Sequence, residues 1–158
     1  MIDARYHFVF DGLQGGPAGY AVAVLRGPAG ELHVRLNPDE SATLAAELAG
    51  VSTPRARLAQ SVGLLAERLD ARLEGVRLHR SGAQIVEAEL ILGRGVGQIE
   101  LPVCFGDGLA LALTHRLPIL GDESLRPLVR APHDAVEEEA EVVLPATIAA
   151  FLNSLPDC

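Results

Sequence analysis

Residues 101–119 read LPVCFGDGLALALTHRLPI, and this stretch decides the fold around which the rest of the chain is organised. Its pattern predicts a strand that turns sharply at 105–108 and enters a short apolar helix, which ends before Pro118. We expect this helix to be buried, because it is apolar on nearly every face. The Cys104 thiol and the Asp107 carboxylate lie at its start and are the groups best placed to face a site. Asp107 is equally well explained as a cap for the free amides of the helix start.

Two further helices are predicted upstream. The first spans 38–49: Asn37 can cap it, Pro38 suits its first position, and Glu40 opposes the helix dipole. The second begins after Thr53. It carries four apolar residues at three- and four-residue spacing, which predict an amphipathic face packed on a sheet: Leu58, Val62, Leu65 and Leu69.

The remaining regular segments have the composition of strands separated by glycine-rich turns. Residues 93–97, GRGVG, precede a strand and are therefore expected to form a hairpin turn rather than a phosphate-binding loop. Together the segments predict an α+β fold, a mostly antiparallel sheet with helices packed against it. The expected strands are 6–10, 20–26, 31–36, 73–79, 83–92 and 96–103.

The length of 158 residues suits one domain. We assign residues 1–130 to the main domain and 131–158 to an acidic linker and C-terminal helix packed on it; the acidic run 137–139 is expected to be a solvated helix face. Hydrophobic residues make up 49% of the chain, which favours a homo-oligomer, a dimer or a trimer, that hides the excess apolar surface.

The charge balance disfavours nucleic acid as a partner. The net charge is −8, all 13 basic residues are arginine, and aromatic residues make up only 4%, too few for a base-stacking platform. Cys104 and Cys158 have no metal-binding or redox spacing, and the five histidines are dispersed, so no metal site is expected. Without a signal-like or membrane-spanning apolar run, the chain is expected to be cytoplasmic and to have no membrane partner.

The stretch 101–119 resembles the signature of the bifunctional nuclease domain family. In that family a strand ending in Asp-Ala-Arg-Pro-Ser-Asp-Ala leads into an Ile-Ala-Leu-Ala-Leu helix and a Pro-Ile strand. Asp107, the helix 109–113 and the pair 118–119 match it. Cys104 stands in place of the family arginine, Phe105 in place of the proline, and Gly106 in place of the serine.

The resemblance extends over residues 6–156. Glu40, with the proline before it and the alanine-rich helix after it, agrees with a family Gly-Pro-x-Glu-Ala pattern. Arg55 falls on the arginine of Arg-Pro-x-Thr-His-Asp, but Ala59 and Gln60 occupy the His and Asp positions, and Glu87 occupies a tyrosine position in the middle strand.

The resemblance implies a metal-assisted nuclease for DNA and RNA that uses Mg²⁺ or Mn²⁺. Phosphodiester cleavage needs an activated water, a leaving-group acid and cations that neutralise phosphate charge. The residues retained for such chemistry, and hence the candidate catalytic residues, are Glu40, Arg55 and Asp107. Glu40 is also explained as a dipole partner in a first helical turn.

The departures favour a different function, because most replace a charged or constrained residue by an apolar, neutral or small one. They predict a pocket for an uncharged, largely hydrophobic small molecule. An enzyme with such a pocket and no cofactor or metal can catalyse a cyclisation, cycloaddition or isomerisation, as in polyketide-like natural-product biosynthesis, by holding its substrate in a reactive conformation. A nuclease and a non-catalytic oligomeric scaffold remain the alternatives. The expected ligand-binding residues are Cys104, Phe105, Ala59, Gln60 and Glu87.

Overall fold

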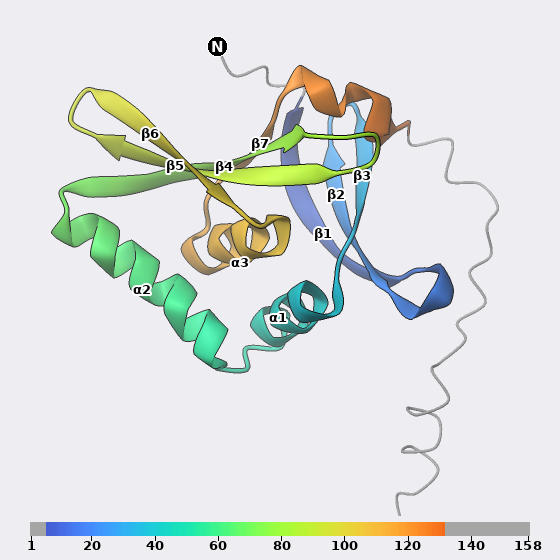
Figure 1. Cartoon of the computed structure of the whole chain (residues 1–158), viewed down its shortest axis with the longest axis horizontal. Coiled ribbons are helices and arrows are strands. Elements are labelled where there is room, and N and C mark those ends of the chain that lie inside the picture. Colours follow the sequence, from blue (N-terminus) through green and yellow to red (C-terminus); the bar gives the residue numbers. More distant parts are fainter. Residues whose placement is uncertain (1–5, 132–158) are drawn as a thin grey trace, which may run out of the picture.

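The computed structural model describes residues 6–131, which form one curved sheet with its three α-helices on a single side (Figure 1). The sheet has eight strands in the order β6-β5-β4-β7-β1-β2-β3-β8. Only the pairing of β4 with β7 is parallel among these strands. The predicted α+β fold with a mostly antiparallel sheet is therefore confirmed. The strands are β1 His7–Gly15, β2 Ala21–Gly27, β3 Gly30–Arg35, β4 Ala71–Arg80, β5 Val86–Arg94, β6 Gly97–Val103, β7 Ile119–Gly121 and β8 Val129–Arg130.

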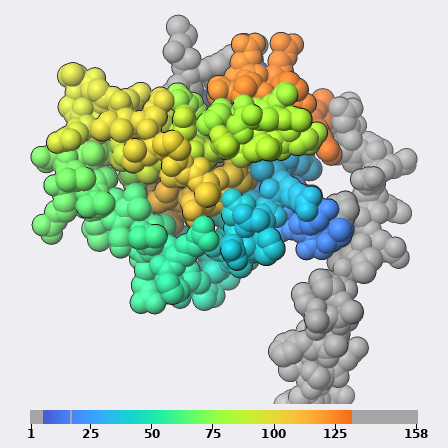
Figure 2. All heavy atoms as spheres, in the orientation of Figure 1, coloured from blue at the N-terminus to red at the C-terminus, as the bar shows by residue number. Residues whose placement is uncertain are grey.

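Three α-helices cover the concave side within the described residues: α1 Pro38–Leu48, α2 Pro54–Arg68 and α3 Phe105–His115. In Figure 1, α3 lies directly under the strands, and α1 and α2 lie on either side of it. Figure 2 shows α1 and α2 next to each other along the lower part of the molecule. Two short 3-10 helices complete the fold, η2 Pro17–Gly19 and η3 Glu123–Leu128. No helix in the span 6–131 is long and apolar enough to cross a membrane.

Local chemistry sets the start of α1 as predicted. The Asn37 side chain accepts a hydrogen bond from the amide of Glu40, and the Glu40 carboxylate accepts one from the amide of Asn37. This reciprocal capping box satisfies two amides that a helix start otherwise leaves free. Thr53 caps α2 by a single bond, in which its side chain accepts from the amide of Ala56.

The burial predicted for α3 is confirmed, but its start differs from the prediction. Cys104 is the N-cap, so residues 105–108 form the first turn of the helix rather than a turn before it. The glycines here serve close packing rather than unusual backbone angles. A Cβ on Gly106 would lie 2.6 Å from side-chain carbons of Glu40, and one on Gly108 would lie 2.8 Å from the Cβ of Ala88. The sequence thus lets α3 approach both α1 and the sheet.

The predicted packing face of α2 is wrong. Three leucines of that face are exposed, at 65% for Leu58, 61% for Leu65 and 54% for Leu69. The helix instead buries a parallel row of small residues, Ala56, Ala59 and Ala66. Small side chains permit a close approach to α3, and Gly63 lies in the same row against the ring of His115. Apolar periodicity identified a helix but could not decide which of two adjacent stripes faces the core.

The C-terminal part of the described chain is more regular than predicted. Pro127 lies inside η3, and β8 follows it and pairs with β3. The predicted acidic linker and final helix, 131–158, lie outside the described residues apart from residue 131.

Candidate functional site

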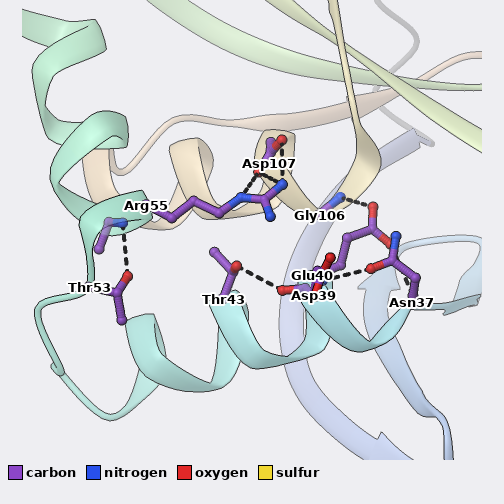
Figure 3. Close-up of polar contacts among 9 residues, drawn as sticks. Asn37, Asp39, Glu40, Thr43, Thr53, Arg55, Gly106 and Asp107 are labelled. Carbon is purple, nitrogen blue, oxygen red and sulfur yellow. Dashed lines mark hydrogen bonds and ion pairs between the residues drawn. The ribbon is translucent and has the colours of Figure 1, made fainter.

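The amino-terminal ends of the three α-helices meet on the sheet-facing side of α1 and α2. Figure 3 shows Glu40 of α1 pointing at the start of α3, and Arg55 of α2 reaching across to Asp107. These are the three retained residues that the family resemblance nominated as catalytic. The fold brings them to one region, although they come from three separate segments of the chain.

Both carboxylate oxygens of Glu40 accept hydrogen bonds from backbone amides. Oε1 accepts from the amide of Gly106 at 3.0 Å, and Oε2 accepts from the amide of Asn37 at 3.1 Å. Because a carboxylate that accepts from helix-start amides is well placed against the positive end of each helix dipole, Glu40 joins the starts of α1 and α3. This arrangement gives Glu40 a positioning role in the fold.

Arg55 and Asp107 form a two-pronged ion pair between α2 and α3. The Arg55 Nε donates to Oδ1 at 2.9 Å, and Nη2 donates to Oδ2 at 3.0 Å. The hydrogen bond that Arg55 donates to Asp107, reinforced by the negative charge of Asp107, raises the pKa of Arg55. The side chains are 42% and 36% exposed, so solvent screens the pair and its contribution to stability is about 1 kcal/mol or less. Asp107 therefore binds the Arg55 side chain, whereas the amide of Gly106 at the start of α3 donates its hydrogen bond to Glu40.

The donor set in this region does not fit the Mg²⁺ or Mn²⁺ that the family resemblance implies. Hard divalent cations of this kind bind through oxygen ligands, usually one or two carboxylates directed at the ion together with waters or substrate phosphates. The oxygens of Glu40 are held by amides, and those of Asp107 by a guanidinium group. Among residues 6–131, no group of three or more His, Cys, Asp or Glu side chains could hold a metal ion. We therefore derive no reaction step through a metal.

A cleft of about 1060 Å³ adjoins the start of α3. The end of β3, the start of α1, the start of β5 and the end of β6 form its walls. Apolar side chains dominate these walls, among them Val34, Ile85, Val86, Val103 and Phe105. The exposed Cys104 thiol also lines the cleft.

The predicted site residues divide between the cleft and the helix layer. Cys104, Phe105, Glu87 and Glu40 line the cleft, whereas Arg55 and Asp107 do not. Neither Ala59 nor Gln60 is part of its wall. Ala59 is buried, with its carbonyl oxygen 2.8 Å from a ring nitrogen of His115, and Gln60 is exposed on α2.

Sequence reasoning missed several residues that line the cleft. Tyr20 precedes β2, Arg35 ends β3, and Gln84 precedes β5. No motif marked them, because they reach one wall only through the pairing of strands. β2 and β3 are neighbours in the sheet and are joined by the turn at 27–30.

Comparison with known proteins supports the resemblance. No curated protein matches the chain. The model of the bifunctional nuclease domain matches residues 23–130, which is well over half of the sequence. The match runs from β2 to β8 and includes the three α-helices and most of the cleft. The chain therefore belongs to the bifunctional nuclease domain family.

Proposed function

We propose that this protein binds a largely hydrophobic small molecule in the cleft beside Cys104 and Phe105, and that it catalyses a cofactor-independent cyclisation or isomerisation of that molecule. The observation that carries the proposal is the cleft itself. Its volume of about 1060 Å³ lies slightly above the ~300–1000 Å³ typical of small-molecule sites. Its apolar walls with a few polar groups are also typical of such sites.

The proposed catalysis rests on restricting a flexible substrate. Apolar walls on several elements can hold reacting atoms of one molecule close together, which lowers the entropic part of the barrier. Glu87 is the cleft carboxylate available for proton transfer, since its side chain is 56% exposed and its Oε2 lies 3.5 Å from Nε2 of His79. Glu40, in contrast, is held by two backbone amides.

The binding part is tested with Nile red, a neutral apolar dye whose fluorescence rises in apolar sites. Ile85→Trp should fill the cleft, because Ile85 lines it and is 59% exposed, so the larger side chain does not disturb the core. Val96→Trp is the matched control, since Val96 is fully exposed in the β5–β6 turn and does not line the cleft. We expect the dye to bind Ile85→Trp at least tenfold more weakly than Val96→Trp. Equal binding to the two variants would overturn the proposal.

Family membership favours a second candidate function, cleavage of DNA or RNA. The residues that would carry it are Arg55 and Asp107, which share an exposed surface at the start of α2 and α3. The test is cleavage of single-stranded DNA and RNA with Mg²⁺ or Mn²⁺ by the wild type, Asp107→Ala and Arg55→Ala. Cleavage that both substitutions abolish, in folded protein, would favour the nuclease over the cleft enzyme. An absence of cleavage by the folded wild type would remove the support for this second candidate.

A further inference from the structure

Arg35 is the one arginine among residues 6–131 that lines the cleft, and an aromatic ring supports its side chain. Arg35 is the last residue of β3, and its guanidinium carbon lies 3.2 Å from the ring centroid of Tyr20, which precedes β2. Both residues line the cleft. A guanidinium group stacked on an aromatic face is attracted to the ring and is restricted in orientation. Arg35 therefore presents its hydrogen-bond donors from a partly ordered position.

The charged side chains that line the cleft differ in whether other groups of the protein bind them. Of the carboxylates that line it among residues 6–131, Glu40 accepts from two amides, whereas Glu87 is 56% exposed and lies 3.5 Å from a ring nitrogen of His79. Arg35 forms neither an ion pair nor a side-chain hydrogen bond with any residue in the range 6–131. Arg77, by contrast, forms an ion pair with Glu89.

We propose that Arg35 binds an acidic group of the cleft ligand. The ligand class is then an apolar molecule that carries one carboxylate or a similarly acidic oxygen group. Its apolar body would pack against Val86, Val103 and Phe105, and its acidic group would accept two parallel hydrogen bonds from the guanidinium fork. This inference rests on the proposed function, since it specifies the ligand of the same cleft. It modifies the expectation of an uncharged ligand, because Arg35 was not among the predicted site residues.

The test compares an anionic and a neutral dye on the same cleft. The anionic dye is 1-anilinonaphthalene-8-sulfonate and the neutral dye is Nile red. Arg35→Gln should weaken binding of the anionic dye about five- to tenfold, the effect expected for one partly exposed charge-assisted contact, and leave Nile red binding unchanged. Arg35→Lys keeps the charge but loses the planar fork, so it should give an intermediate loss. Arg94→Gln is the matched control, because Arg94 is exposed at the end of β5 and does not line the cleft.

The outcomes separate this inference from the proposed function. If Arg35→Gln and Arg94→Gln bind the anionic dye equally well, or if Arg35→Gln loses both dyes to the same extent, the assignment of Arg35 is wrong. The proposed function survives that result as long as Ile85→Trp still binds Nile red at least tenfold more weakly than Val96→Trp. If neither dye responds to Ile85→Trp, the cleft is not the binding site, and both proposals fail.

Discussion

Replacing Glu40 by alanine tests whether this residue positions the helices or takes part in chemistry. The substitution removes two acceptors at once, the partner of the Asn37 amide within α1 and the partner of the Gly106 amide in α3. Loss of half of a capping box costs about 1 kcal/mol of folding free energy. A hydrogen bond to a charged group contributes about 1.5–3 kcal/mol. Since the contact with Gly106 is only partly buried, we take the lower end for it and expect a total loss of about 2–3 kcal/mol.

The measurement is urea unfolding at neutral pH, followed by far-ultraviolet circular dichroism. Asp39→Ala is the matched control, because Asp39 has the same charge and lies in the same first turn. Asp39 accepts a hydrogen bond from the Thr43 hydroxyl through its backbone carbonyl, which the substitution keeps. The control should lose about 0.3–1 kcal/mol, the usual effect of one charge near a helix start. Glu40→Gln keeps one acceptor oxygen and should fall between the two. The reasoning is refuted if Glu40→Ala costs no more than Asp39→Ala.

Three further predictions concern packing, pH and self-association. Gly108→Ala should destabilise the fold by about 1–3 kcal/mol, since the added methyl group would lie 2.8 Å from a side-chain carbon of β5; unchanged urea unfolding would contradict this packing. The pKa of Glu31 is lowered, chiefly by its hydrogen bond to His33. The bond between Glu31 and His33 therefore stabilises the fold fully above the unfolded pKa of about 4.5, and this stabilisation is lost as the pH falls through the lower folded pKa. Glu31→Gln should therefore flatten the decline in the free energy of unfolding below pH 4.5. An identical acid decline in the wild type and the variant would show that this pair contributes nothing. The exposed leucine stripe of α2, with the high apolar content, predicts association with a second copy of the chain, which sedimentation velocity would detect over a range of concentrations. Leu65→Glu should give a monomer. Leu64→Glu should not, because Leu64 is similarly exposed but lies about 100° away around the helix. A wild type that stays monomeric at all concentrations would contradict the prediction.

The parts of the fold that short-range chemistry controls were predictable from the sequence. The capping box of α1 depends on residues three apart, and the β2–β3 hairpin depends on the turn that joins its strands. The burial of α3 follows from its composition, because nearly all of its side chains are apolar. The motif around Asp107 also indicated the family, which the match to residues 23–130 confirms.

The tertiary structure alone decided which residues act together. Glu40 could be interpreted as a dipole partner or as a catalytic group, and its bond to an amide 66 positions away explains why it holds the helices. The leucine stripe of α2 is as apolar as a core face, yet the adjacent alanine row packs on α3 because small residues permit closer contact. Arg35 carries no motif, and it reaches the cleft only because the sheet pairs β3 with β2 and places the start of α1 beside β5. Contacts between distant segments depend on the path of the whole chain and on packing volume, and neither is encoded in local spacing.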